Sequence, residues 1–269
     1  MILASEECDL TENAVCAPTE VTELFEFREP IFEILGFPIT RTVVLIFLAA
    51  VIVVGLVFFG LRRQAVVPGK FQVAMESLMG FVRDEVAIGI IGPEGIKYYP
   101  YLLSLFLFIL VGNFFEVTPF INFPITSRMA IPMFLALVTY VIFISAGLKR
   151  QGYRYVTEII WPPGVPLLLK PLVGIIEFFS IFFIRPFSLA VRLFANLVAG
   201  HVMLTVLLVT GVVALSSFST IGGKALFGIA WWGIGLAIFM FEVIVIILQA
   251  YIFTLLSAVY IETSLHPQH

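Results

Sequence analysis

The sequence predicts an all-α protein that crosses a membrane several times. Of its 269 residues, 61% are hydrophobic and 12% are charged, and the mean hydropathy is +1.09, whereas a soluble domain is about half apolar. Three uncharged runs of 18 to 20 residues are each long enough to cross about 30 Å of hydrocarbon. Residues 171–261 contain five charged side chains. We therefore expect an acidic tail at 1–40 and a single membrane domain at 41–269.

The N-terminal tail, residues 1–40, is distinguished by its charge. It holds nine of the eighteen acidic residues and one basic residue, Arg28. It lacks the basic start and short apolar core of a signal peptide, so we interpret it as a tail on the outer side of the membrane. Cys8 and Cys16 are the two cysteines of the chain, and for them a local disulfide and two free thiols are equally open.

Three spanning helices are expected in the first part of the membrane domain, at 41–62, 98–117 and 128–148. Pairs of basic residues close the first and the third. Between the first two, residues 70–92 carry an apolar stripe at helical spacing, with most of the charged residues off it. This pattern indicates an amphipathic helix on the membrane surface or against a partner, because the segment is too polar to span.

The C-terminal part is expected to form a hairpin of two long helices, at 168–216 and 220–262. A polar, glycine-containing turn separates two apolar halves of roughly 40 residues, about twice the length that a perpendicular crossing needs. Helices of that length must tilt, bend or break within the membrane, and Pro186 is a natural bending point. We predict a long, strongly tilted hairpin.

The basic residues beside the spans predict the orientation. The loops at 62–97 and 149–170 hold nine Lys and Arg residues together, and the opposite side holds four. Because basic loops stay in the cytoplasm, we expect the N-terminus outside and the C-terminus inside.

The hairpin also carries polar residues inside apolar sequence. Ser188, Arg192 and Asn196 share one helix face, and His201 falls on the opposite face because it lies nine residues past Arg192. Glu242 and Gln249, seven apart, share a face of the second helix. A charge at mid-membrane costs roughly 3 kcal/mol, so a functional role is expected for Arg192.

Structural roles remain the alternatives for these polar residues. Arg192 and Glu242 would then form an internal ion pair, and His201 would be a hydrogen-bonded core residue. Together, His201 and Glu242 also fit a proton relay. The sequence lacks a Cys/His cluster, paired haem ligands, a nucleophile with its base and a glycine-rich phosphate loop. We expect no metal, no cofactor and no nucleic-acid partner.

Two motifs then indicate a family. RPFSLAVRLFANLVAGH (185–201) with FEVIVIILQAYIFTLLSAVY (241–260) resembles subunit a of the F-type ATP synthases. The resemblance is densest over 168–262, extends loosely to LVGNFFEVTPF (110–120), and is absent from residues 1–35. It implies a membrane stator subunit beside a rotating ring of c subunits, each with a buried carboxylate, and the tilted hairpin would face that ring.

The resemblance also implies roles for residues at the centre of the hairpin. Arg192 matches the essential arginine, which keeps the passing ring carboxylate ionised and blocks direct proton passage between two offset half-channels. Asn196 and Gln249 match polar positions near it. Ser188 matches a position on the cytoplasmic outlet route.

His201 and Glu242 match positions on the inlet route from the outside. The histidine is on the first helix of the hairpin and the glutamate on the second, which is similar to the mitochondrial arrangement. Asn113 and Glu116 match positions where the family's third helix meets that route. One departure concerns Glu177, the candidate for an outlet glutamate. It lies one residue further from Arg192 than the family pattern expects, an offset that a helical bulge would absorb.

Three hypotheses follow. The first is a proton-translocating stator subunit, with no catalysis of its own, in a bacterial plasma membrane, assembled with the c ring, the peripheral-stalk b subunits and other ATP synthase subunits. The second is a self-contained channel or transporter with Arg192 as an anion site. The third is a structural membrane scaffold. The His201 and Glu242 pair favours protons over sodium ions.

Overall fold

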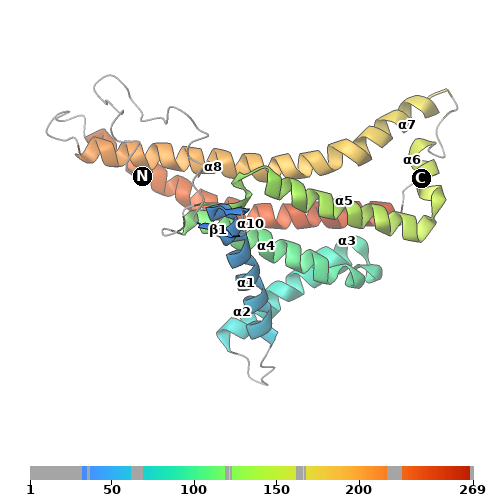
Figure 1. Cartoon of the computed structure of the whole chain (residues 1–269), viewed down its shortest axis with the longest axis horizontal. Helices are drawn as coiled ribbons and strands as arrows, with labels where there is room; N and C mark the ends of the chain where they lie inside the picture. Colours follow the sequence, from blue (N-terminus) through green and yellow to red (C-terminus); the bar gives the residue numbers. More distant parts are fainter. Residues whose placement is uncertain are drawn as a thin grey trace.

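The computed structural model describes residues 32–34, 37–61, 69–118, 121, 123–161, 166, 168–216 and 226–266. Cys8, Cys16 and most of the predicted tail lie outside these residues, as does the predicted turn after residue 216. The described part is dominated by helices, as Figure 1 shows. A short antiparallel pair, β1 (Phe32–Ile34) and β2 (Phe37–Ile39), precedes the first helix. The other described elements are helical, as the all-α prediction expects. Strands of three residues are too short to show the alternation of apolar and polar residues by which a strand is recognised in a sequence.

Five helices are long and apolar enough to cross a membrane, which confirms the number expected from the sequence. They are α1 (Arg41–Leu61), α4 (Tyr99–Val117), α5 (Ala130–Gln151), the continuous unit from Lys170 to Ser216, and α10 (Leu226–Leu265). Each forms because an uninterrupted apolar sequence must satisfy its backbone hydrogen bonds internally in lipid. The chain is a multi-pass membrane protein.

The amphipathic segment between α1 and α4 is one bent helical stretch. It comprises α2 (Lys70–Phe81), the π-helix η2 (Val82–Ile88) and α3 (Gly89–Ile91), followed by the 3-10 helix η3 (Pro93–Lys97). Val82 and Val86 are buried in the core that this stretch shares with α4 and α10. Most of its charged side chains are exposed, so one face packs and the other is available to solvent or headgroups.

The first arm of the C-terminal hairpin is 47 residues long. It comprises α7 (Lys170–Phe179), the π-helix η5 (Ser180–Ile184) and α8 (Arg185–Ser216). At 1.5 Å per residue it extends about 70 Å. Its axis turns between α7 and α8 in Figure 1. The turn lies just before Pro186, whose ring removes one backbone donor from the helix.

The second arm, α10, lies beside α8 and runs in the opposite direction (Figure 1). Glycines let the two helices approach closely. A Cβ at Gly228 would lie 2.9 Å from the Cβ of Ala214, and one at Gly211 would lie 3.0 Å from the backbone nitrogen of Trp232. Small residues allow such contacts between membrane helices. On its other side α10 packs against α4 and α5.

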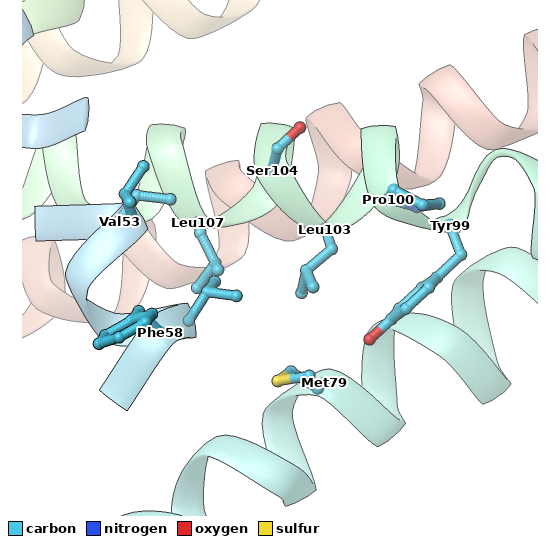
Figure 2. A pocket seen from close by; sticks show the side chains of 10 residues that line it. Val53, Phe58, Met79, Tyr99, Pro100, Leu103, Ser104 and Leu107 are labelled. Atoms are coloured by element: carbon cyan, nitrogen blue, oxygen red, sulfur yellow. The ribbon is translucent and has the colours of Figure 1, made fainter. Parts of the chain in front are cut away.

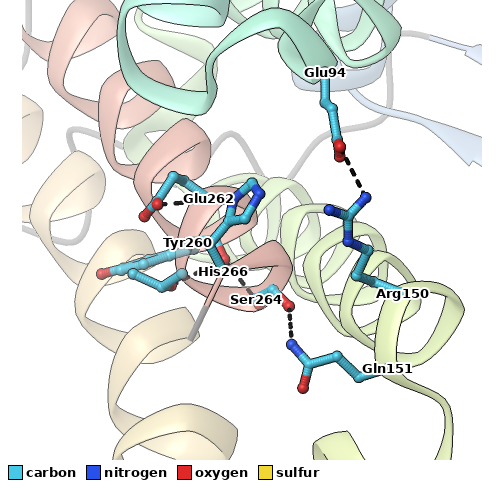
Figure 3. A network of polar contacts seen from close by, with 8 residues as sticks. Glu94, Arg150, Gln151, Tyr260, Glu262, Ser264 and His266 are labelled. Carbon is cyan, nitrogen blue, oxygen red and sulfur yellow. Dashed lines mark hydrogen bonds and ion pairs between the residues drawn. The ribbon is translucent and has the colours of Figure 1, made fainter. Parts of the chain in front are cut away.

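A polar network anchors the C-terminal end of α10, and Figure 3 shows the contact between Gln151 and Ser264. Gln151 donates through Nε2 to the backbone oxygen of Ser264 at 3.3 Å. The hydroxyls of Tyr155 and Ser264 lie 3.1 Å apart. Tyr155 comes from α6 (Tyr153–Ile160), and its ring packs on Gly147. Burial raises the pKa of Tyr155 above its ordinary value, opposed by the hydrogen bond with Ser264. These contacts fix α10 relative to α5 and α6.

Candidate functional site

Arg192 lies on the outward face of α8. It is exposed together with Asn196 and Ala199, which occupy the following turns of the same face. Within the part of the chain that the structure describes, no acidic side chain pairs with Arg192, so the internal ion pair with Glu242 is not formed. Hydrocarbon does not solvate a guanidinium. An exposed guanidinium on a membrane helix is therefore a candidate for pairing with a polar or anionic group.

One turn further along α8, a hydrogen bond ties the hairpin together. Asn196 donates through Nδ2 to Oε1 of Gln249 at 2.9 Å. Gln249 is buried on α10. The bond therefore sets the register of α8 against α10 beside Arg192.

The buried side of α8 meets a cluster of ionisable residues. His201 is 5% exposed, Glu116 on α4 is 4% exposed and Glu242 on α10 is 3% exposed. Nδ1 of His201 lies 3.5 Å from Oε1 of Glu116. Glu242 is close enough to Glu116 to interact electrostatically. Three helices thus bring together groups that can hold and exchange a proton.

Gly200 makes room for this cluster. A Cβ at position 200 would overlap with the carboxyl group of Glu242. The sequence indicates that the small residue Gly200 allows another helix to approach closely. It does not indicate which side chain occupies the space. That depends on the register of α10 against α8.

Asn113 and Thr126 extend the cluster along α4. Oγ1 of Thr126 donates to Oδ1 of Asn113 at 2.6 Å. Thr126 belongs to the 3-10 helix η4 (Ile125–Ser127) between α4 and α5. Sequence periodicity does not reveal Thr126, because a residue in a connecting segment follows no helical period.

The outlet candidates lie toward the other end of the α7–α8 unit. Ser188 donates locally to the backbone oxygen of Arg185 at 3.2 Å. Nη1 of Arg185 lies 3.3 Å from Oγ1 of Thr263, and its guanidinium lies 5.3 Å from the ring centroid of Tyr260. Ser188 and Glu177 are 13 and 24 residues before His201, so they are not part of the buried ionisable cluster.

The π-helix η5 lies between Glu177 and Arg192. A π-helical turn takes one residue more than an α-helical turn. Fifteen steps of 100° would leave the two side chains about 60° apart, and absorbing one residue changes this to about 40°. A bulge of the kind that the sequence offset requires is therefore present.

Among the described residues, neither a metal-ligand cluster nor the cavity between α1, α2 and α4 adds to this site. Within the described ranges, no three His, Cys, Asp or Glu residues are arranged to hold a metal ion. A cavity of about 710 Å³ lies between α1, α2 and α4, lined mainly by apolar side chains that include Val53, Leu103 and Met79. Figure 2 shows that it contains none of the ionisable residues above.

Comparison with known proteins bears on the whole membrane domain. The family described as "ATP synthase A chain" matches residues 43–262. A protein named ATP synthase subunit a from Frankia alni is 42% identical over 224 residues, which cover 82% of this chain and 76% of the relative. The same subunit from Rhodococcus erythropolis is 38% identical over 232 residues, covering 86% and 84%. That from Gluconacetobacter diazotrophicus is 37% identical over 227 residues, covering 82% and 86%. The resemblance carried by the two hairpin motifs is thus confirmed, and the chain belongs to the ATP synthase A chain family.

Proposed function

We propose that this proton-translocating stator subunit of an F-type ATP synthase uses Arg192 as the electrostatic partner of a passing ring carboxylate. The subunit is non-catalytic, and its chemistry is proton transfer. The observation that carries the proposal is the exposure of Arg192 on a membrane helix, with no acidic partner among the described residues. A carboxylate from a c subunit supplies the anion that pairs with this guanidinium.

The cation acts on that carboxylate in two ways. A fixed positive charge nearby favours the ionised form of a carboxyl group, so a ring carboxylate releases its proton when it arrives at Arg192. The same charge repels a proton that would cross between the half-channels without using the ring. Each proton that leaked across without turning the ring would dissipate about 2.3 kcal/mol per 100 mV of membrane potential.

The inlet half-channel consists of the buried cluster on α4, α8 and α10. Glu116, His201 and Glu242 exchange the proton, and Asn113 lies one turn before Glu116 on α4. The 3.5 Å separation of His201 and Glu116 supports proton transfer between them, directly or through one water. An imidazole beside two carboxyl groups suits protons rather than sodium ions, which prefer oxygen ligands.

The outlet half-channel runs along α7 and the start of α8. Ser188 lies one turn before Arg192, and Glu177 lies beyond the π-helix η5. The bulge rotates Glu177 toward the face of Arg192, which supports a role for this glutamate despite its offset in the sequence.

The hairpin presents this machinery to the ring. An arm of 47 residues is longer than the bilayer is thick, and the axis of α1 runs across the direction of α8 in Figure 1. Both features support a strongly tilted hairpin that follows the curved rotor. The N-terminus would be outside and the C-terminus in the cytoplasm of a bacterial cell. Peripheral-stalk b subunits would complete the stator.

Cross-linking tests which face meets the ring. In a background with Cys8 and Cys16 replaced by serine, Ala199→Cys is combined with a cysteine beside the carboxylate of the c subunit. Ala199 shares the face of Arg192, whereas Val212→Cys is an exposed control about 160° away around α8. We expect oxidation to join Ala199→Cys, and not Val212→Cys, to the c subunit.

The opposite pattern would show that Arg192 does not face the ring. The rival hypothesis, a self-contained transporter, predicts solute transport by the isolated chain in liposomes. The stator proposal predicts none without the ring.

A further inference from the structure

The segment between α4 and α5 is buried to an unusual degree for a connection. Phe123, Ile125, Thr126 and Ser127 are each at most 3% exposed. Connecting segments ordinarily run over the surface because their backbone groups need hydrogen-bond partners. Here the segment folds back onto the helices, and the backbone nitrogen of Phe123 donates to the backbone oxygen of Phe115 at 3.4 Å.

The buried turn η4 is held against α4 and α8 by packing. Gly112 on α4 faces Ile125, and a Cβ at Gly112 would lie 3.0 Å from Cδ1 of Ile125. Val198 and Val202 of α8 pack against the same apolar cluster. These two valines flank His201 in sequence, so η4 adjoins the helical turn that carries the inlet histidine.

Two hydroxyls in η4 have different partners. Ser127 donates to the backbone oxygen of Pro124 at 2.8 Å, within the turn. Thr126 instead donates across to Asn113 at 2.6 Å. Both are buried, and only one reaches the residues of the inlet. They form a natural pair of test and control positions.

The bond from Thr126 determines what Asn113 can offer. A side-chain amide has one acceptor oxygen and two donor hydrogens on its nitrogen. Oδ1 accepts from Thr126, and Nδ2 is buried with no hydrogen-bond partner among the described residues. A buried donor of this kind binds water where space allows. Asn113 and Glu116 are three residues apart, and residues so spaced are neighbours on a helix surface.

We propose that η4 is the outer wall of the proton inlet and that Thr126 is its positioning residue. Thr126 holds the Asn113 amide so that Nδ2, and not Oδ1, is presented to water beside Glu116. A donor at this point orients a water with its oxygen toward Asn113 and its hydrogens toward the carboxyl group. Protons then reach Glu116 along a defined path. This inference rests on the proposed inlet function of Glu116 and His201.

The test compares Thr126→Val, Thr126→Ser and Ser127→Ala in the assembled complex. Passive proton conduction is measured in vesicles stripped of the water-soluble sector, across a range of pH and per assembled complex. For Thr126→Val we expect conduction to fall about two- to tenfold, the range given by one lost neutral hydrogen bond, and its pH profile to shift. Thr126→Ser retains the donor, so it should keep both near wild type, and Ser127→Ala should leave the pH profile unchanged.

Two results would overturn the proposal. One is a wild-type pH profile and conduction per complex in Thr126→Val. The other is an equal effect of Ser127→Ala, which would indicate that the turn needs its hydroxyls for folding alone. If Thr126→Val does not assemble, Thr126→Cys provides the same test because a thiol is a weak donor of similar volume.

Arg192→Ala, measured in parallel, separates this inference from the proposed function. If Arg192→Ala pumped protons at the wild-type rate, the proposed half-channel function itself would be wrong. Lost pumping in Arg192→Ala with unchanged behaviour of Thr126→Val would remove only the role of Thr126.

Discussion

Replacing Gly200 by alanine adds one methyl group where α8 meets Glu242 of α10. A Cβ at this position would overlap with the carboxyl group of Glu242. Overpacking of this kind costs about 1–3 kcal/mol, while alanine gains about 1 kcal/mol over glycine in helix propensity. The end of a glutamate side chain moves more easily than two packed helices. We therefore expect the hairpin to assemble and the carboxyl group to be displaced.

The free-energy cost of this overlap determines how far proton conduction is expected to fall. At 1.4 kcal/mol per factor of ten, a cost of 1–3 kcal/mol lowers the population with Glu242 in its native position by about 5- to 150-fold. Proton conduction through stripped vesicles should fall within that range per assembled complex. Gly55→Ala on α1 is the control, because a Cβ there meets nothing within 4 Å.

A shorter acid should relieve the clash. Combining Gly200→Ala with Glu242→Asp removes one methylene and is expected to recover part of the lost conduction relative to Gly200→Ala. Wild-type conduction by Gly200→Ala itself would show that Glu242 does not need its place beside Gly200.

The other predictions concern the contacts that fix α10. Asn196→Leu leaves the buried Gln249 without its donor and should destabilise the complex by about 1–3 kcal/mol; Asn196→Leu with Gln249→Leu should restore much of its thermal stability, and additive losses would contradict the pairing. Gly147→Ala should destabilise the docking of α6, because a Cβ would lie 2.6 Å from the ring of Tyr155, and faster proteolysis at α6 would report it. Because the pKa of Tyr155 is raised in the folded protein, the contribution of its neutral side chain to folding stability is intact below about pH 10. That contribution is lost as the pH rises toward the folded-state pKa. Tyr155→Phe should remove that alkaline loss from the pH dependence of unfolding, and an unchanged alkaline limb would count against it.

Sequence length and periodicity were sufficient for the helical framework. Apolar runs of about 20 residues must be helical in lipid, so α1, α4 and α5 follow directly from composition. The two arms of the hairpin follow from the scarcity of charge between Pro171 and Ile261. Arg192 stands out from sequence because a charge in apolar surroundings is costly whatever the tertiary structure.

The helical repeat of a single segment does not show which residues of two helices will contact each other. The bond from Thr126 to Asn113 joins a connecting turn to α4, and the space at Gly200 serves a side chain 42 positions further along the chain. Both depend on how α4, α8 and α10 are rotated against one another, which packing of the whole domain determines. The sequence offset of Glu177 indicates that a helical bulge is needed, but it does not indicate that the bulge lies at η5.

We propose for Arg192 two roles at once, as the partner of the ring carboxylate and as the barrier between the half-channels. The most direct test uses membrane vesicles that carry the whole complex with either the wild-type chain or Arg192→Ala. ATP-driven proton pumping and passive proton leak are recorded in both, with assembly of the complex verified. For Arg192→Ala we expect intact assembly, lost pumping and increased leak. Pumping at the wild-type rate would contradict this proposal and leave Arg192 as a structural ion.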